Sequence, residues 1–247
     1  EAESLLKEAH EKIDIDSGQI IVMKPDSGRI LAMANYPSYD VNKYSKEGDL
    51  EIFQNSAVQK LFEPGSVFKP FTMAMALEER KVTPVSTFTD TGSIKIGPDT
   101  VRNFDQKTYG KQTMSGILEK SINTGAVYLS QLLPRQTMFN YIEELGFTGK
   151  TGIDVQGEVS SENQNLETGS DFGYATASFG QGIEMTPVQL VRAFSVFANG
   201  GKLPDPYLVE KIVYGQEELV TKPNLSDSIF SNKTVSEVTA MLVNVVE

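Results

Sequence analysis

The spacing of apolar residues divides the chain into one extended hairpin and a series of helices. Residues 1–12 place their leucines on one face, which predicts an amphipathic helix. Two apolar runs, residues 18–24 and 29–34, flank the sequence Pro-Asp-Ser-Gly at residues 25–28. Proline presets φ in such a turn and glycine accepts a positive φ, so the two runs predict a β-hairpin.

Helical periodicity dominates the rest of the chain. The further predicted helices span residues 66–81, 113–145, 186–199 and 231–247. The second of these is interrupted near Asn123 and again near Pro134, whereas the third opens on Thr186-Pro187, a favourable N-cap and N1 pair. Residues 36–55 indicate a loop and residues 84–102 short extended pieces. No internal repeat or low-complexity linker divides the chain into independent domains.

Composition agrees with an ordinary globular protein. The 247 residues are 39% hydrophobic and 22% charged, which is too much apolar material for a disordered chain. No apolar run reaches the ~18 residues that a membrane-spanning helix needs. The formal net charge of −11, without clusters of Lys and Arg, argues against a nucleic-acid partner.

Cysteine and histidine usage narrows the possible chemistry. Zero cysteines exclude disulfides, thiolate metal sites and a cysteine nucleophile, but they indicate no compartment. The one histidine, His10, falls in the N-terminal helix, where a surface position is the simpler interpretation. Catalytic triads of the Ser-His-Asp and Cys-His types are therefore excluded unless His10 reaches Ser66.

The sequence Ser66-Val67-Phe68-Lys69 begins a predicted helix that contains Pro70. Proline is tolerated in a first helical turn, where the N–H groups have no helical partner, so the helix must begin at about Ser66. Ser66 and Lys69, at i and i+3, then lie on one face at the positive end of the helix dipole. A partly desolvated lysine there is able to take a proton from the serine hydroxyl, and the exposed N–H groups stabilise an oxyanion.

A purely structural interpretation of the same two residues is also open. Ser66 would be an N-cap and Lys69 a solvated charge, and the Ser-x-x-Lys pattern by itself is common. A lysine in the first turn opposes the helix dipole, however. The flanking Pro64-Gly65 and Pro70-Phe71-Thr72 also make this context less generic.

A second polar pair follows at Ser121 and Asn123. Residues at i and i+2 cannot share a helix face, so both side chains reach one pocket only from a turn. Ser121 would then relay a proton between Lys69 and a leaving group, and Asn123 would hold a substrate carbonyl or orient Lys69. Alternatively, the pair is a helix cap with Asn123 in the left-handed conformation.

Taken together, these motifs resemble the transpeptidase domain of penicillin-binding proteins. The run Glu63–Thr72 is followed about 50 residues later by Ser121-Ile122-Asn123, in agreement with the Ser-x-x-Lys signature and the second polar element of that superfamily. Residues 18–44, with a Pro-Ser-x-Asp-x-Asn turn, are similar to the family's opening hairpin. Residues 145–158 and 179–201 are similar to the monofunctional, class B group.

The resemblance implies an α+β serine acyltransferase fold, with an antiparallel sheet flanked by helices and a helical subdomain at roughly residues 84–175. It implies a D,D-transpeptidase that cross-links peptidoglycan stem peptides during cell division or shape maintenance. Ser66 would be the nucleophile, Lys69 its base and Ser121 a proton relay, while Asn123 would bind substrate. Residues 180–182, Gly-Gln-Gly, either line the site or form a tight turn.

Partners and location follow from the resemblance in the same way. The substrate would be a stem peptide ending in D-Ala-D-Ala, and β-lactam antibiotics would acylate the same serine. A glycosyltransferase of the cell-wall machinery is a further expected partner, whereas no metal or cofactor is implied. The family implies a position outside the bacterial cytoplasmic membrane, anchored by a segment N-terminal to Glu1.

A Lys-Thr-Gly tripeptide, the family's third element, occurs at residues 150–152, only 27 positions after Asn123. The segment around it resembles a loop after the helical subdomain, whereas the family's functional tripeptide lies on a strand much further along. We therefore assign Lys150 no catalytic part and expect the natural protein to continue beyond Glu247 with the missing strands and last helix. The alternative is a compact variant in which Lys150 is the working lysine.

Two other functions stay open on the sequence alone. A β-lactamase shares Ser66 and Lys69, but it needs a positioned base and water for rapid deacylation, and no recognisable loop carboxylate supplies that base. A non-catalytic β-lactam sensor or binding module of the same fold is the second alternative.

Overall fold

The structure, a computed structural model, describes residues 1–246. The α-helices are α1 (Ala2–Ile13), α2 (Ser56–Gln59), α3 (Lys69–Glu78), α4 (Met114–Glu119), α5 (Asn123–Gln131), α6 (Arg135–Glu144), α7 (Asn165–Thr168), α8 (Asp171–Ala177), α9 (Pro187–Phe194) and α10 (Asn232–Val246). The strands are β1 (Gly18–Met23), β2 (Ile30–Tyr36), β3 (Thr87–Asp90), β4 (Ser93–Ile96), β5 (Asp99–Arg102), β6 (Gly110–Thr113), β7 (Lys202–Pro204), β8 (Lys211–Tyr214), β9 (Glu217–Val220) and β10 (Leu225–Ser228). Short 3-10 helices are η1 (Tyr44–Lys46), η2 (Leu50–Phe53), η3 (Gly65–Phe68) and η4 (Ser195–Ala198).

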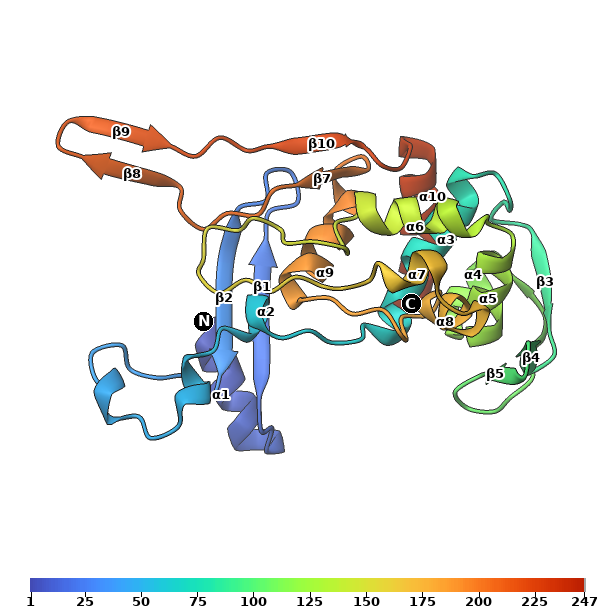
Figure 1. Cartoon of the computed structure of the whole chain (residues 1–247), viewed down its shortest axis with the longest axis horizontal. Coiled ribbons are helices and arrows are strands. Elements are labelled where there is room, and N and C mark those ends of the chain that lie inside the picture. The colour runs from blue at the N-terminus through green and yellow to red at the C-terminus, as the bar shows by residue number, and fades with distance from the viewer. Residues whose placement is uncertain (247) are drawn as a thin grey trace.

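The predicted hairpin is present as β1 and β2, which pair antiparallel with Gly18 opposite Tyr36. Helix α1 contacts both strands, and α9 and α2 also contact β1 (Figure 1). One apolar cluster joins the strands to these elements through Ile30, Val58 and Val188. The hairpin is therefore stabilised by helix packing, which a two-stranded ribbon requires in water.

The remaining strands form four more antiparallel pairs: β3 with β6, β4 with β5, β7 with β10, and β8 with β9. The first two pairs lie beside α5 at the opposite side of the molecule from β1 and β2, whereas the β8–β9 hairpin extends away from the body (Figure 1). Helices packed with antiparallel strands make this an α+β fold, as predicted.

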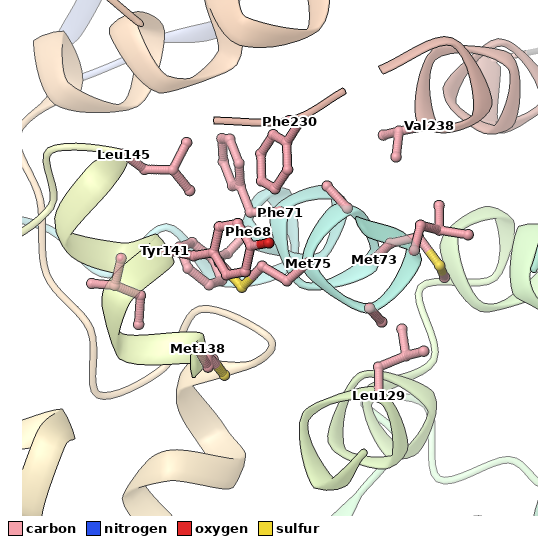
Figure 2. Packing of buried hydrophobic residues seen from close by; sticks show 14 of the residues in the cluster. Phe68, Phe71, Met73, Met75, Leu129, Met138, Tyr141, Leu145, Phe230 and Val238 are labelled. Atoms are coloured by element: carbon pink, nitrogen blue, oxygen red, sulfur yellow. The ribbon is translucent and has the colours of Figure 1, made fainter. Parts of the chain in front are cut away.

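Helix α3 is the centre of the core. Every residue from Lys69 to Leu77 is buried, so the helix has no solvent-facing side. Side chains from α5, α6 and α10 surround it (Figure 2), including Leu129, Met138 and Val238. The Phe71 ring packs against four other aromatic rings, those of Phe68, Phe147, Phe194 and Phe197. Close packing of these rings fixes the position of α3 and therefore of the residues at its N-terminal end.

The predicted helices are present with local differences. The expected helix at residues 66–81 begins as the 3-10 turn η3, and the α-helix follows from Lys69 with Pro70 in its first turn. The expected helix at residues 113–145 is broken into α4, α5 and α6, first at Ser121, where φ is +51°. Thr186 caps α9 in a reciprocal capping box with Gln189. Within residues 1–246, no helix combines the length and apolar character needed to cross a membrane.

Candidate active site

Ser66 and Lys69 lie together at the N-terminal end of α3, as the sequence predicted. Ser66 is exposed in the turn η3, whereas the Lys69 side chain is buried, with 2% of the residue accessible. The Lys69 Nζ atom is 3.1 Å from Ser66 Oγ. The 3-10 turn thus presents the hydroxyl to solvent and keeps the amine beneath it.

Ser121 and Asn123 meet the same amine from a distant part of the chain. Lys69 Nζ donates to the Ser121 backbone oxygen at 2.6 Å, to Ser121 Oγ at 2.9 Å and to Asn123 Oδ1 at 2.8 Å. Together with Ser66 Oγ, four oxygens surround an ammonium that has only three N–H bonds. A neutral amine has a free lone pair, so the Ser66 hydroxyl is then able to donate its proton to Nζ.

Burial makes this amine easy to deprotonate. Desolvation disfavours the ammonium form and lowers the pKa of Lys69 to about 7, from the usual 10.5. The neutral amine is therefore accessible near neutral pH, unlike that of a solvated lysine. A lysine with this pKa is suited to act as a general base near neutral pH.

The turn between α4 and α5 brings Ser121 and Asn123 into one site. Ser121 adopts a left-handed backbone with φ of +51°, and Asn123 is the first residue of α5. The left-handed residue is therefore Ser121, and the alternative that placed Asn123 in this conformation is wrong. A non-glycine residue at positive φ costs about 1–3 kcal/mol, and such strain is concentrated at functional sites.

The loop at residues 179–183 holds the Ser66 turn in place. Gly65 N–H donates to the Gly180 backbone oxygen at 2.9 Å, and Gly182 N–H donates to a Glu63 carboxylate oxygen at 2.9 Å. A Cβ atom on Gly180 would lie 2.1 Å from the Gly65 backbone oxygen. Glycine is therefore required at position 180 by the close approach of two backbones.

A pocket of about 250 Å³ opens beside Ser66. It is lined by Ser66, Asn103, Phe104, Asp105, Tyr109, Lys120 and Ser121. Phe104 is 96% exposed, which leaves an aromatic face at the rim of the pocket. The pocket is accessible from solvent, so an acyl group attached to Ser66 has space beside it.

Comparisons with known proteins agree with this geometry. The family model described as the penicillin binding protein transpeptidase domain matches residues 18–247. This chain belongs to that family. Among curated proteins it is 34% identical over 245 residues to the stage V sporulation protein D of Bacillus subtilis, covering 98% of this chain and 38% of that protein. It is 33% identical over 242 residues to the probable peptidoglycan D,D-transpeptidase PenA of Neisseria gonorrhoeae, covering 98% and 39% respectively.

Solved structures show the same fold. Penicillin binding protein 3 from Mycobacterium tuberculosis in complex with aztreonam superposes with a TM-score of 0.92 at 26% identity, covering 100% of this chain and 55% of that one. The transpeptidase domain of Burkholderia pseudomallei penicillin-binding protein 3 has a TM-score of 0.81, covering 99% and 66%. The chain spans less than half the length of the curated relatives named above.

The tripeptide Lys150-Thr151-Gly152 has a different environment from the site around Ser66 and Lys69. Thr151 donates both its N–H and its hydroxyl to the Glu158 carboxylate, and Gly152 N–H donates to the same group. Lys150 is exposed, and Ile153 packs with β2 and α9. The tripeptide is therefore part of a loop clamped by Glu158.

His10 also lies elsewhere in this transpeptidase fold. Its ring packs on Tyr36 and its Nδ1 atom bonds with the Ile15 backbone oxygen at 2.8 Å, in the region of α1 and β2. Among the described residues, no three potential His, Asp or Glu metal ligands gather at one point. The groups within hydrogen-bonding distance of Lys69 come from Ser66, Ser121 and Asn123.

Sequence reasoning missed the residues that support Asn123. Asp90 and Asn103, both buried, form hydrogen bonds with Thr124 at the start of α5. The one local signal was the sequence Asp90-Thr91-Gly92 between short extended pieces, which is typical of an Asx-turn. That pattern indicates a turn without indicating what the turn supports.

Proposed function

We propose that this chain carries the acyl-transfer site of a peptidoglycan D,D-transpeptidase, with Ser66 as nucleophile and Lys69 as its base. The single observation behind the proposal is the placement of a buried amine 3.1 Å from an exposed serine hydroxyl, within a fold shared with penicillin-binding proteins. Relatives named as D,D-transpeptidases support the substrate class.

In the first half of the reaction, neutral Lys69 accepts the Ser66 proton while Oγ attacks the penultimate D-Ala carbonyl of a stem peptide. The tetrahedral intermediate then collapses and breaks the C–N bond to the terminal D-Ala. The leaving amine receives a proton from the Ser121 hydroxyl, which Lys69 re-protonates across 2.9 Å. An ester on Ser66 remains and free D-Ala departs.

In the second half, the amine of a neighbouring stem attacks the ester carbonyl. A new amide forms, and the proton lost by the attacking amine returns through Ser121 and Lys69 to the Ser66 oxygen. Asn123 Oδ1 holds Lys69 in position throughout, and the adjoining pocket receives the acyl group. A glycosyltransferase partner and a position on the outer face of the cytoplasmic membrane belong to the same proposal.

β-Lactams provide the direct test, since they would acylate Ser66 in place of the stem peptide. Incubation with a fluorescent penicillin followed by peptide mass mapping is expected to locate one adduct on Ser66, and Ser66→Ala is expected to abolish it. Failure of any β-lactam to label the intact protein would support a non-catalytic module instead. Hydrolysis of the adduct within seconds would support a β-lactamase.

A further inference from the structure

A buried carboxylate lies behind Asn123, outside the groups that the proposed reaction uses. Asp90, at the end of β3, is 1% exposed and accepts four hydrogen bonds. Its Oδ1 atom accepts from Gly92 N–H at 2.8 Å and from the Thr124 hydroxyl at 2.6 Å. Its Oδ2 atom accepts from Asn103 Nδ2 at 2.9 Å and from Tyr109 N–H at 2.7 Å.

These four bonds keep Asp90 ionised at neutral pH. Burial alone would raise the pKa of Asp90, but the hydrogen bonds from Thr124, Tyr109, Gly92 and Asn103 outweigh it, so the pKa lies below its usual value. A carboxylate with four donors is a strong anchor, because hydrogen bonds to a charged acceptor are about twice as strong as neutral ones.

From Asp90 a chain of contacts leads to Lys69. The Asn103 side chain, bound to Asp90, also donates to the Lys107 backbone oxygen at 3.0 Å and accepts from Thr124 N–H at 3.2 Å. The neighbouring Arg102 backbone oxygen is thereby held in place, and it accepts from Asn123 Nδ2 at 3.1 Å.

The Arg102 contact decides which way the Asn123 amide faces. Because Nδ2 is engaged by the Arg102 oxygen, Oδ1 must point to the other side, where it accepts from Lys69 Nζ at 2.8 Å. A flipped amide would direct two N–H bonds at Lys69. Resting on the transpeptidase function proposed above, we propose that Asp90 is a positioning residue that, through Asn103 and Arg102, keeps the Asn123 oxygen on Lys69.

The substitution Asp90→Asn tests this inference with little change in shape. An amide places its NH₂ group either at Oδ1, facing Gly92 N–H, or at Oδ2, facing Tyr109 N–H. Both orientations leave a backbone donor without its acceptor, so the segment holding the Arg102 oxygen must shift. Asn103→Ala is the second variant. It keeps the Asp90 carboxylate but removes the hydrogen bond from the Asn103 side chain by which Asp90 holds the segment containing Arg102.

Acylation by a fluorescent penicillin in stopped flow separates binding of the drug from the acylation rate constant. We expect the rate constant to fall about 10- to 100-fold in both variants, because a displacement near 1 Å at a reacting group can cost about 100-fold. Losing the Asn123 acceptor also disfavours the Lys69 ammonium, so the half-maximal pH of acylation should move below the wild-type value.

Glu158→Gln is the matched control. Glu158 also clamps a loop through three hydrogen bonds, but that loop holds Thr151 and Gly152 rather than the site. This control should lower the melting temperature without changing the acylation rate constant or its pH midpoint.

If Asp90→Asn and Asn103→Ala both fold and both keep the wild-type acylation rate constant and pH midpoint, the positioning inference is wrong. If Asp90→Asn does not fold, the result for Asn103→Ala is decisive by itself. Failure of the wild-type protein itself to be acylated would instead contradict the proposed function.

Discussion

The close approach of Gly180 to the Ser66 turn predicts a large effect for a single added methyl group. In Gly180→Ala the new Cβ atom would lie 2.1 Å from the Gly65 backbone oxygen and 2.6 Å from its nitrogen. Both neighbours are backbone atoms, so no side-chain rotation relieves the contact. Gly180 also has φ of +80°, where an alanine is itself unfavourable.

Two costs follow from this geometry. The left-handed backbone costs an alanine about 1–2 kcal/mol. Overpacking adds about 1–3 kcal/mol, because the two backbones must separate by roughly 1 Å before they reach van der Waals contact. Gly65 directly precedes Ser66, so the separation displaces Ser66 from Lys69. We expect acylation to fall about 100-fold, the cost of a displacement of this size.

Gly182→Ala is the matched control for backbone strain. Gly182 has φ of +72°, but its nearest neighbour to an added Cβ is Thr176 Oγ1 at 3.5 Å, an ordinary contact. Urea unfolding should therefore show a loss of about 1–2 kcal/mol in this variant. Its acylation by a fluorescent penicillin should stay near the wild-type rate.

The test is a comparison of the acylation rates of Gly180→Ala and Gly182→Ala. If both fold and Gly180→Ala is acylated as fast as Gly182→Ala, the contact with Gly65 does not determine where Ser66 lies. Loss of acylation in both to the same extent would assign the effect to backbone strain in the loop rather than to the contact.

The remaining predictions concern two lysines. Acylation of the wild-type protein should slow as pH falls through about 7, because burial lowers the pKa of Lys69 to about 7 and protonation removes the base. Between pH 7 and 10.5 the unfolded chain holds a proton on Lys69 that the folded chain lacks, so unfolding free energy should rise with pH. Lys69→Met should abolish acylation and remove this rise, as measured by urea titrations at pH 7 and pH 9; an unchanged rise would contradict the burial argument. Lys150→Ala should leave acylation within about twofold of wild type, since surface changes away from the site have small effects, whereas a tenfold loss would favour the compact alternative.

Local chemistry accounts for what the sequence predicted well. Pro70 lacks an N–H and is confined to a first turn, so it located the start of α3 to within a few residues. The turn residues at positions 25–28 located the β1–β2 hairpin for the same kind of reason. The pairing of Ser66 with Lys69 followed from this helix start, because side chains three positions apart lie on the same face of a helix.

Contacts between distant segments decided the rest. Ser121 lies 52 positions from Lys69, and its positive φ is imposed by the turn between α4 and α5 rather than by any preference of serine. The support of Asn123 by Asp90 also joins distant segments through Asn103, so no local pattern indicated it. The same holds for the approach of Gly180 to Gly65.

The sequence by itself therefore determined which residues are candidates for this chemistry, namely a serine at a helix start, a lysine three positions later and a polar pair downstream. Tertiary packing determined the reactivity of that lysine. Its pKa near 7 results from burial at the end of a helix enclosed on every side. Burial depends on elements throughout the chain, and desolvation of a charge is a property of that surrounding volume rather than of the neighbouring sequence.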